Sequence, residues 1–355
     1  MKKSFGLTAG LILLLIALLL GCGGKDVSDA QQTEAVDGKP TDAGITERTD
    51  GVPVSLTDPD IVGVPHEGTY SFCRDEWDLY KATFVSDSLL KIERWHRGNS
   101  YQDPPFRYKD DTCVINIGDH STDFRWLDDS GSAFTVTMHD DNNEIWTEDE
   151  LAGFSKDAEG EALPTYSYMH DAWNTYRAIR LSDTTVKIEK WYRASSSRYA
   201  PDYIDPPFYY NQDVGVFGAD DLKWLDQSGS AFELAFIDDS NKNMEAVETV
   251  RFALDSGSAK RYVLRHDEWN VYKAIVLSDT CVKIEVWHRD SSYKNPPFFH
   301  DRDLCVIETS EPDIGFAWGD ADHSAFSVFI SDSENSEWKE PETVWFVAET
   351  ADDGQ

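Results

Sequence analysis

One stretch of sequence occurs three times in this chain of 355 residues, and this repeat constrains the fold more than any other feature. The first motif of the repeat, found at 96-residue intervals, occurs as Arg74-Asp-Glu-Trp, His170-Asp-Ala-Trp and His266-Asp-Glu-Trp. The second, Lys-Ile-Glu-x-Trp-x-Arg, begins at Lys91, Lys187 and Lys283. Units of this size exceed the roughly 20–50 residues of solenoid repeats, so we expect three modules arranged as beads on a string.

Two shorter motifs recur with small shifts and complete the module. Pro-Pro-Phe ends at Phe106, Phe208 and Phe298, and Ser-Ala-Phe ends at Phe134, Phe232 and Phe326. The repeats place the modules at residues 66–158, 163–256 and 260–350. We expect these three phenylalanines after Ser-Ala to be core residues, together with six recurring tryptophans: Trp77, Trp173, Trp269, Trp126, Trp224 and Trp318.

The local pattern within a module predicts an all-β fold. Tyr272–Leu277 and Cys281–Trp287 are rich in β-formers and flank a Ser-Asp-Thr turn, which is typical of a hairpin. Similar segments predict about six short antiparallel strands per module, as in a small β-sandwich or barrel. Trp77–Tyr80 is the one place where a single helical turn remains open.

Composition excludes some partners. The net charge of −34 argues against nucleic acid and anionic lipid headgroups, because phosphate binding needs clustered Lys and Arg. Residues 22–65 are small and polar, without Trp, Tyr or Phe, and we expect them to be a disordered linker.

The first residues resemble a targeting segment. Lys2 and Lys3 precede an apolar run, Leu7–Leu20, that is too short for a comfortable membrane span. The run ends in Leu19-Leu20-Gly21-Cys22, which resembles the lipobox of bacterial lipoproteins. That resemblance implies a signal peptide over residues 1–21 and a lipid on Cys22 that holds the protein to the membrane. It places the protein in the cell envelope, and in the outer membrane if the cell is Gram-negative, because Gly23 replaces the aspartate of inner-membrane retention. An ordinary secretory signal with an incidental cysteine is the alternative.

Four more cysteines remain in the modules. In an oxidising compartment an even number favours disulfides, and we expect the pairs Cys73–Cys113 and Cys281–Cys305, although the sequence permits three pairings. No Cys-x-x-Cys or Cys/His cluster indicates a metal site. Oxygen-rich turns follow one strand of each module, beginning at Asp140, Asp238 and Asp332; they suit Ca²⁺, but ordinary hairpin turns are favoured and no cofactor is predicted.

One face of the repeated strand is identical in all three copies and is the candidate binding site. Because side chains alternate along a strand, Lys, Glu, Trp and Arg share this face. The candidate ligand-binding residues are Glu93, Trp95, Arg97, Glu189, Trp191, Arg193, Glu285, Trp287 and Arg289. A tryptophan flanked by Glu and Arg suits stacking on a sugar ring. The alternative is a structural ladder of cross-strand ion pairs with Trp packed over it.

No catalytic motif is present: the sequence lacks G-x-S-x-G, H-E-x-x-H, a phosphate loop and a dinucleotide fingerprint. We therefore predict no catalytic residue and expect a lipid-anchored envelope protein with three binding modules. Polysaccharide is the first-choice ligand, since three weak sites gain avidity on a polymer. A structural or adaptor lipoprotein that contacts envelope proteins is the alternative, and an extracytoplasmic enzyme is a weaker one. The oligomeric state stays open.

Overall fold

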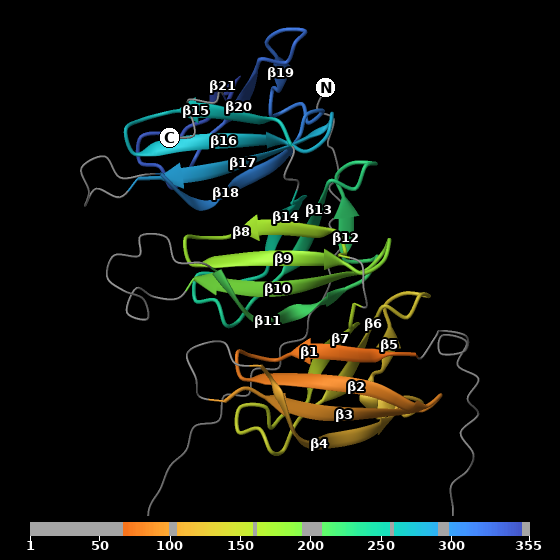
Figure 1. Cartoon of the computed structure of the whole chain (residues 1–355). Coiled ribbons are helices and arrows are strands. Elements are labelled where there is room, and N and C mark those ends of the chain that lie inside the picture. Colours follow the sequence, from red (N-terminus) through yellow and green to blue (C-terminus); the bar gives the residue numbers. More distant parts are fainter. Residues whose placement is uncertain are drawn as a thin grey trace, which may run out of the picture. The chain divides into compact units, whose positions relative to one another are not determined.

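The computed structural model describes residues 67–98, 105–158, 162–193, 208–255, 259–289 and 298–349, and it confirms the all-β prediction (Figure 1). Apart from one short 3-10 turn, η1 (His120–Thr122), the regular elements of these residues are strands. They form three seven-stranded antiparallel sheets, one in each repeat, and all three sheets belong to one compact unit. The repeat in sequence is therefore a repeat in structure.

The strands of the three modules have the following bounds. Module 1 consists of β1 (Thr69–Cys73), β2 (Asp78–Ser86), β3 (Leu89–His96), β4 (Arg107–Asn116), β5 (Arg125–Trp126), β6 (Ala133–Met138) and β7 (Glu150–Lys156). Module 2 consists of β8 (Thr165–Met169), β9 (Asn174–Arg180), β10 (Val186–Arg193), β11 (Phe208–Phe217), β12 (Leu222–Trp224), β13 (Ala231–Phe236) and β14 (Glu248–Leu254). Module 3 consists of β15 (Arg261–Arg265), β16 (Asn270–Val276), β17 (Cys281–His288), β18 (Phe299–Glu308), β19 (Ala317–Trp318), β20 (Ala325–Ile330) and β21 (Glu342–Ala348).

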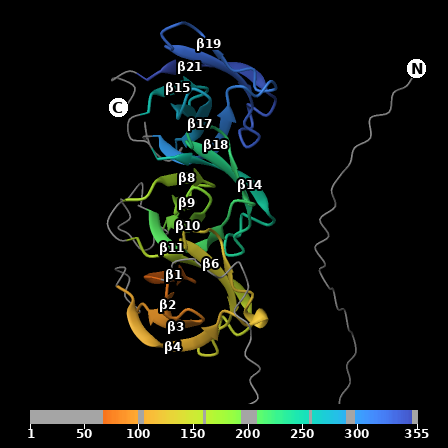
Figure 2. The same ribbon diagram turned by 90° about the vertical axis from the view of Figure 1, so that its right-hand side faces the viewer.

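The strand order in module 1 is β4-β3-β2-β1-β7-β6-β5, and the other two modules repeat it. The first strand pairs with the second and with the last, so it joins two hairpin-connected halves into one sheet. Figure 2 shows the sheets curling, so that each module is a half-barrel. Sequence patterns missed β1, β8 and β15, because five residues give too short an alternation to separate a strand from a loop. The open helical turn near Trp77 is instead a bend that leads into β2.

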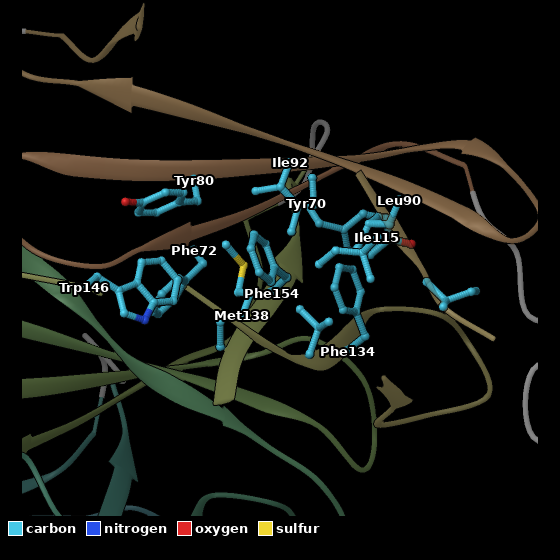
Figure 3. Close-up of a cluster of buried hydrophobic side chains, with 14 residues drawn as sticks. Tyr70, Phe72, Tyr80, Leu90, Ile92, Ile115, Phe134, Met138, Trp146 and Phe154 are labelled. Atoms are coloured by element: carbon cyan, nitrogen blue, oxygen red, sulfur yellow. The ribbon is translucent and has the colours of Figure 1, made fainter. Parts of the chain in front are cut away.

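Aromatic side chains fill the interior of each curled sheet, as Figure 3 shows for module 1. Alternation along β3 turns Leu90 and Ile92 inward, and β6 contributes Phe134, which stacks on Phe154 at 5.2 Å between ring centroids. The prediction that the phenylalanines after Ser-Ala belong to the core is confirmed, because the equivalent Phe232 and Phe326 are also fully buried.

The turn before this phenylalanine explains the Ser-Ala-Phe motif. In module 1 the carboxylate of Asp128 accepts hydrogen bonds from the backbone N–H of Ser132, at 3.0 Å, and from its hydroxyl. Gly131 turns the chain between them with a φ of 66°, which glycine adopts without strain. Asp226 and Ser230 make the same pair of bonds in module 2.

The tryptophan prediction holds in part. Trp126, Trp224 and Trp318 pack, partly buried, against the three cores. Trp173 and Trp269 are exposed instead, because their motif forms the tight connection between the first two strands. Two other tryptophans, Trp146 and Trp338, are fully buried, and the repeat did not reveal them because module 2 has Met244 at that place.

The four cysteines of the described residues are free, so the prediction of two disulfides is wrong. Two strands separate Cys73 on β1 from Cys113 on β4. At about 4.8 Å per strand this is roughly 14 Å, beyond the ~7 Å between Cα atoms that a disulfide tolerates. Cys281 lies opposite Glu308, whereas Cys305 lies opposite Ile284 and so points to the other face of the sheet.

Successive modules share buried contacts, which corrects the expectation of beads on a string. Leu225, Ala231 and Ala253 of module 2 form one apolar cluster with Cys281 and Val306 of module 3. These five residues are all buried. The outer surface of one half-barrel therefore becomes the neighbour's packing surface.

Candidate functional site

The repeated Lys-Glu-Trp-Arg face lies on the outer side of the third strand of each module. The inward partners of this strand are core residues, and alternation turns the motif away from the core. The structure brings the predicted glutamate and tryptophan together in every copy. The indole N–H donates to the glutamate Oε2 in the pairs Trp95–Glu93 (3.4 Å), Trp191–Glu189 (3.0 Å) and Trp287–Glu285 (3.0 Å).

A cation covers one face of each of these half-buried tryptophan rings. It comes from the second strand of the same module, which neighbours the motif strand. The cation-to-centroid distances are 4.3 Å for Lys81 over Trp95, 4.0 Å for Arg177 over Trp191 and 3.7 Å for Lys273 over Trp287. A sugar that stacked on this side of the indole would have to displace the cation, so the arrangement favours the structural ladder.

The arginine of the motif turns elsewhere and does not join the tryptophan. Its guanidinium packs on the phenylalanine of the Pro-Pro-Phe motif in the same module. The distances from Cζ to the ring centroid are 4.1 Å for Arg97–Phe106, 4.4 Å for Arg193–Phe208 and 4.1 Å for Arg289–Phe298. This contact explains why the arginine of Lys-Ile-Glu-x-Trp-x-Arg and the phenylalanine of Pro-Pro-Phe recur together. It anchors the end of the third strand against the start of the fourth.

The lysine of the motif binds an aspartate of the fourth strand that the sequence analysis missed. Lys91 Nζ lies 2.9 Å from a carboxylate oxygen of Glu93 and 2.9 Å from one of Asp111. The equivalent lysine–aspartate pairs are Lys187–Asp213 at 2.9 Å and Lys283–Asp303 at 3.0 Å. The signal was present in the sequence, since each aspartate stands two residues before the aligned positions Cys113, Gly215 and Cys305.

In modules 2 and 3 this aspartate also reaches the preceding module. Asp213 accepts a hydrogen bond of 2.8 Å from the backbone N–H of Cys73, the last residue of β1. Asp303 accepts one of 2.8 Å from the N–H of Met169, the last residue of β8. The aspartate side chains are 2% and 3% exposed at these junctions, whereas that of Asp111 in module 1 is 54% exposed. Two of the three copies of the candidate site therefore lie at contacts between modules.

The buried copies keep their charges because they are paired. Burial opposes ionisation of Lys187, but the carboxylates of Asp213 and Glu189 outweigh it and raise the lysine pKa. Burial likewise opposes ionisation of Asp303, but the ammonium of Lys283 prevails and lowers the aspartate pKa. Lys187 and Asp303 are thus charged at neutral pH, and each carries a desolvation cost that its ion-pair partner helps to offset.

Glu285, His300 and Asp303 of module 3 place one potential metal-ligand atom each within 4.8 Å of one another. Lys283 already supplies a positive charge there, 3.0 Å from Asp303 and 3.5 Å from Glu285. A metal ion would have to displace that ammonium, so we assign the group to the ion-pair network. His300 has its own structural contact, since it stacks on Trp287 at 5.4 Å.

The acidic turns that suggested Ca²⁺ direct their first aspartate into the module. Asp140 accepts a hydrogen bond of 2.9 Å from the hydroxyl of Tyr80, and Nη1 of Arg94 lies 3.6 Å away. The corresponding ion pairs in the other modules are Lys190–Asp238 at 2.8 Å and Arg302–Asp332 at 2.6 Å. A protein cation thus stands where a calcium ion would need to bind, and this favours ordinary turns.

The Asp-x-Trp motif is a structural turn as well. The Asp75 carboxylate accepts hydrogen bonds from the backbone N–H of Trp77, at 2.7 Å, and of Asp78, at 2.9 Å. The side chain of the residue before it contacts a glutamate at the start of the last strand. These pairs are Arg74–Glu150, His170–Glu248 and His266–Glu342. Because Arg serves as well as His, the position has no shared role as a catalytic base.

Comparisons with known proteins add no function to this geometry. The sequence matches no family model, and no relative is found among curated proteins. Within the part of the chain that the structure describes, no helix is long and apolar enough to cross a bilayer. Cys22, the expected lipid attachment, lies outside the described residues, as does the linker over residues 22–65.

Proposed function

We propose that the protein is a non-enzymatic structural or adaptor lipoprotein of the cell envelope that acts through protein–protein contacts. The observation that carries this proposal is where the repeated Lys-Glu-Trp-Arg face lies relative to the neighbouring modules. In modules 2 and 3 its lysine–aspartate pair packs against the preceding module, whereas in module 1 the same face presents Val85, Leu89 and Val114 to solvent. A surface of this kind suits a protein partner.

Polysaccharide binding is the second proposal, and module 1 supports it best. There Trp95 lies beside Tyr108, with ring centroids 6.2 Å apart, and the tyrosine is exposed. Two aromatic rings at an open surface suit a sugar chain. The Lys81 ammonium over Trp95 weighs against it. The lysine–aspartate pair beside the tryptophan is open to solvent in module 1 and buried in modules 2 and 3, so avidity along a polymer is also reduced.

The contact proposal is tested with a photo-reactive amino acid placed at Val114 in the full chain in living cells. Val247 provides the matched control, because it is equally apolar and similarly exposed but lies at a turn of module 2. Protein adducts that form at position 114 and not at 247 are the expected result. Absence of adducts, with retention of the chain on envelope polysaccharide that depends on Trp95, would replace the first proposal by the second.

The lipid anchor rests on the lipobox alone and has its own test. Growth with an alkyne-bearing fatty acid is expected to label the wild-type chain and to leave Cys22→Ala unlabelled and released from the membrane fraction. Equal labelling of the two would remove the anchor from the proposal. Loss of the label from a protein that stays in the membrane fraction would mean another attachment.

A further inference from the structure

The two junctions between modules are built from the same positions. We call the surface that a module presents to its predecessor the entry face, and the surface that it presents to its successor the exit face. At the second junction the entry face of module 3 contributes Cys281, Val306 and the partly buried Leu277 to the apolar cluster. The exit face of module 2 contributes Leu225 and its neighbours to the same cluster.

The first junction repeats this arrangement. Gly153 on the exit face of module 1 lies so close to Val216 that a Cβ at Gly153 would come within 2.6 Å of a valine methyl. Val216 occupies in β11 the place that Val306 occupies in β18. Gly218 of module 2 faces Leu127, the module 1 counterpart of Leu225.

A polar bond at each junction has the same chemistry. The hydroxyl of Ser182 donates to the carboxylate of Asp128 at 2.8 Å across the first junction. Ser278 donates to Asp226 at 2.6 Å across the second. One geometric relation between neighbours is therefore used twice, and it joins two different surfaces, as a heterologous contact does.

Module 1 carries an entry face that no described residue covers. Val85, Leu89 and Val114 stand where Leu277, Cys281 and Val306 stand in module 3, and all three are exposed, Val114 by 61%. Ser86 occupies the place of Ser182 and Ser278. The apolar and polar elements of an entry face are thus complete in the one module that has no predecessor among the described residues.

Module 3 carries the complementary exit face. Val347 and Trp345 are exposed by 54% and 52%, and they occupy the places of Ala253 and Arg251 in module 2. The indole of Trp345 lies over Gly319, which replaces Leu225, so the apolar surface is retained by a different residue. Asp320 stands where Asp128 and Asp226 accept the serine hydroxyl.

We propose that the partner of these two faces is a second copy of this chain, joined head to tail, with the exit face of module 3 on the entry face of module 1. Stacked repeats end in polar caps when they face solvent, whereas here both outer faces expose large apolar side chains. Both halves of a contact that the chain already makes twice are present on one molecule. Such a heterologous contact joins further copies into a ring or an open chain. This inference rests on the proposed function, because both require that the protein acts through protein–protein contacts. It adds that the partner is another copy of the same chain.

The test is cross-linking of the full chain in membranes with a short thiol-reactive bifunctional reagent. Ser86→Cys combined with Asp320→Cys is expected to give a ladder of dimers and larger multiples, with each single variant and the wild type as background. Ser182→Cys with Asp128→Cys is the matched control, because it should join positions within one chain and give no ladder. If the control cross-links and the first pair yields no product between copies, the proposal is overturned.

A second variant tests the face itself. Adding Val114→Asp to the cross-linking pair is expected to reduce the ladder at least tenfold, whereas Val247→Asp leaves it unchanged. The intrachain control cross-link, formed in the Val114→Asp background, shows that the module contact is intact. Added salt should strengthen the ladder, because it screens repulsion between copies of net charge −34. A ladder that persists in Val114→Asp overturns the assignment. Adducts at position 114 with a different protein overturn self-association and leave the adaptor proposal standing.

Discussion

Modules 1 and 3 carry the same lysine–glutamate–aspartate group in opposite surroundings. In module 1 the side chain of Asp111 is 54% exposed, and its contact with Lys91 is a surface ion pair. In module 3 the side chain of Asp303 is 3% exposed and binds Lys283 and the backbone of module 2. A surface pair contributes little to stability, whereas removing one member of a buried pair strands the other charge. Identical sequence therefore performs a structural task in one copy and is left available in another.

The largest effect is expected from removing the buried aspartate. Asp303→Ala leaves the Lys283 ammonium buried without its closest partner, which is expected to reduce the free energy of unfolding by about 3–5 kcal/mol. Asp111→Ala, at the same place in module 1, is expected to leave the urea midpoint unchanged. Urea unfolding of both variants makes the comparison, and equal losses would show that burial at the junction is not the cause.

The apolar part of the junction is expected to come next. Leu225→Ala removes a buried side chain from the cluster between modules 2 and 3 and is expected to reduce the free energy of unfolding by about 2–3 kcal/mol. Leu89→Ala, on the exposed entry face of module 1, is expected to change it by less than about 0.5 kcal/mol in monomeric protein. A large loss for Leu89→Ala would mean that this face is already covered.

A smaller effect is expected from the polar bond between modules. Burial opposes ionisation of Asp226, but hydrogen bonds from Ser230 and Ser278 outweigh it and lower its pKa to about 2. Because this pKa lies below the ordinary value of about 3.9, the ionised carboxylate stabilises the fold above that pH, and the contribution is lost as the pH falls toward 2. Ser278→Ala is expected to raise the pKa of Asp226, measured by NMR titration, and to flatten the acid limb of stability. Ser86→Ala should change neither quantity.

The smallest effect concerns the cysteines, where alkylation of the folded protein is compared with alkylation of the denatured protein. Burial raises the pKa of the Cys113 and Cys281 thiols to about 11, so we expect slow alkylation of the folded protein at neutral pH. After denaturation without reductant, intact mass should show alkylation of the four module cysteines. A disulfide in either module would leave two of them unmodified.

Much of the fold was predictable because it depends on local pattern. The third strand alternates apolar and polar residues in every copy, so its buried face, with Ile92 and Ile284, follows from the sequence. The short first strand was missed because five residues give too short an alternation, and its place between two halves of the sheet is decided by pairing with β2 and β7. The disulfide prediction was wrong for the same reason: spacing along the chain does not say that two strands separate Cys73 from Cys113.

The sequence predicted which residues of the candidate site share a strand face, but not which residues of other strands and modules contact them. Glu285 and Trp287 lie together as neighbours on one strand face should, and their hydrogen bond agrees with the structural ladder. Lys273, which covers the tryptophan ring, comes from the adjacent strand and had no recognisable motif of its own. Asp303 was present in the repeat but acquires its role from Met169 of another module.

The sequence by itself determined the number of modules, their β-character and the side of the third strand that faces the core, because these follow from repetition and from the two-residue period of a strand. The tertiary structure decided which copies of the outer face are buried. Burial of that face depends on a neighbouring module, and the local sequence of Lys91-Ile-Glu-x-Trp is the same as that of Lys283-Ile-Glu-x-Trp whether or not a neighbour is present. Asp303 is buried because module 2 packs against it. Val114 of the first module and Trp345 of the third are exposed because no described module packs against their outer faces.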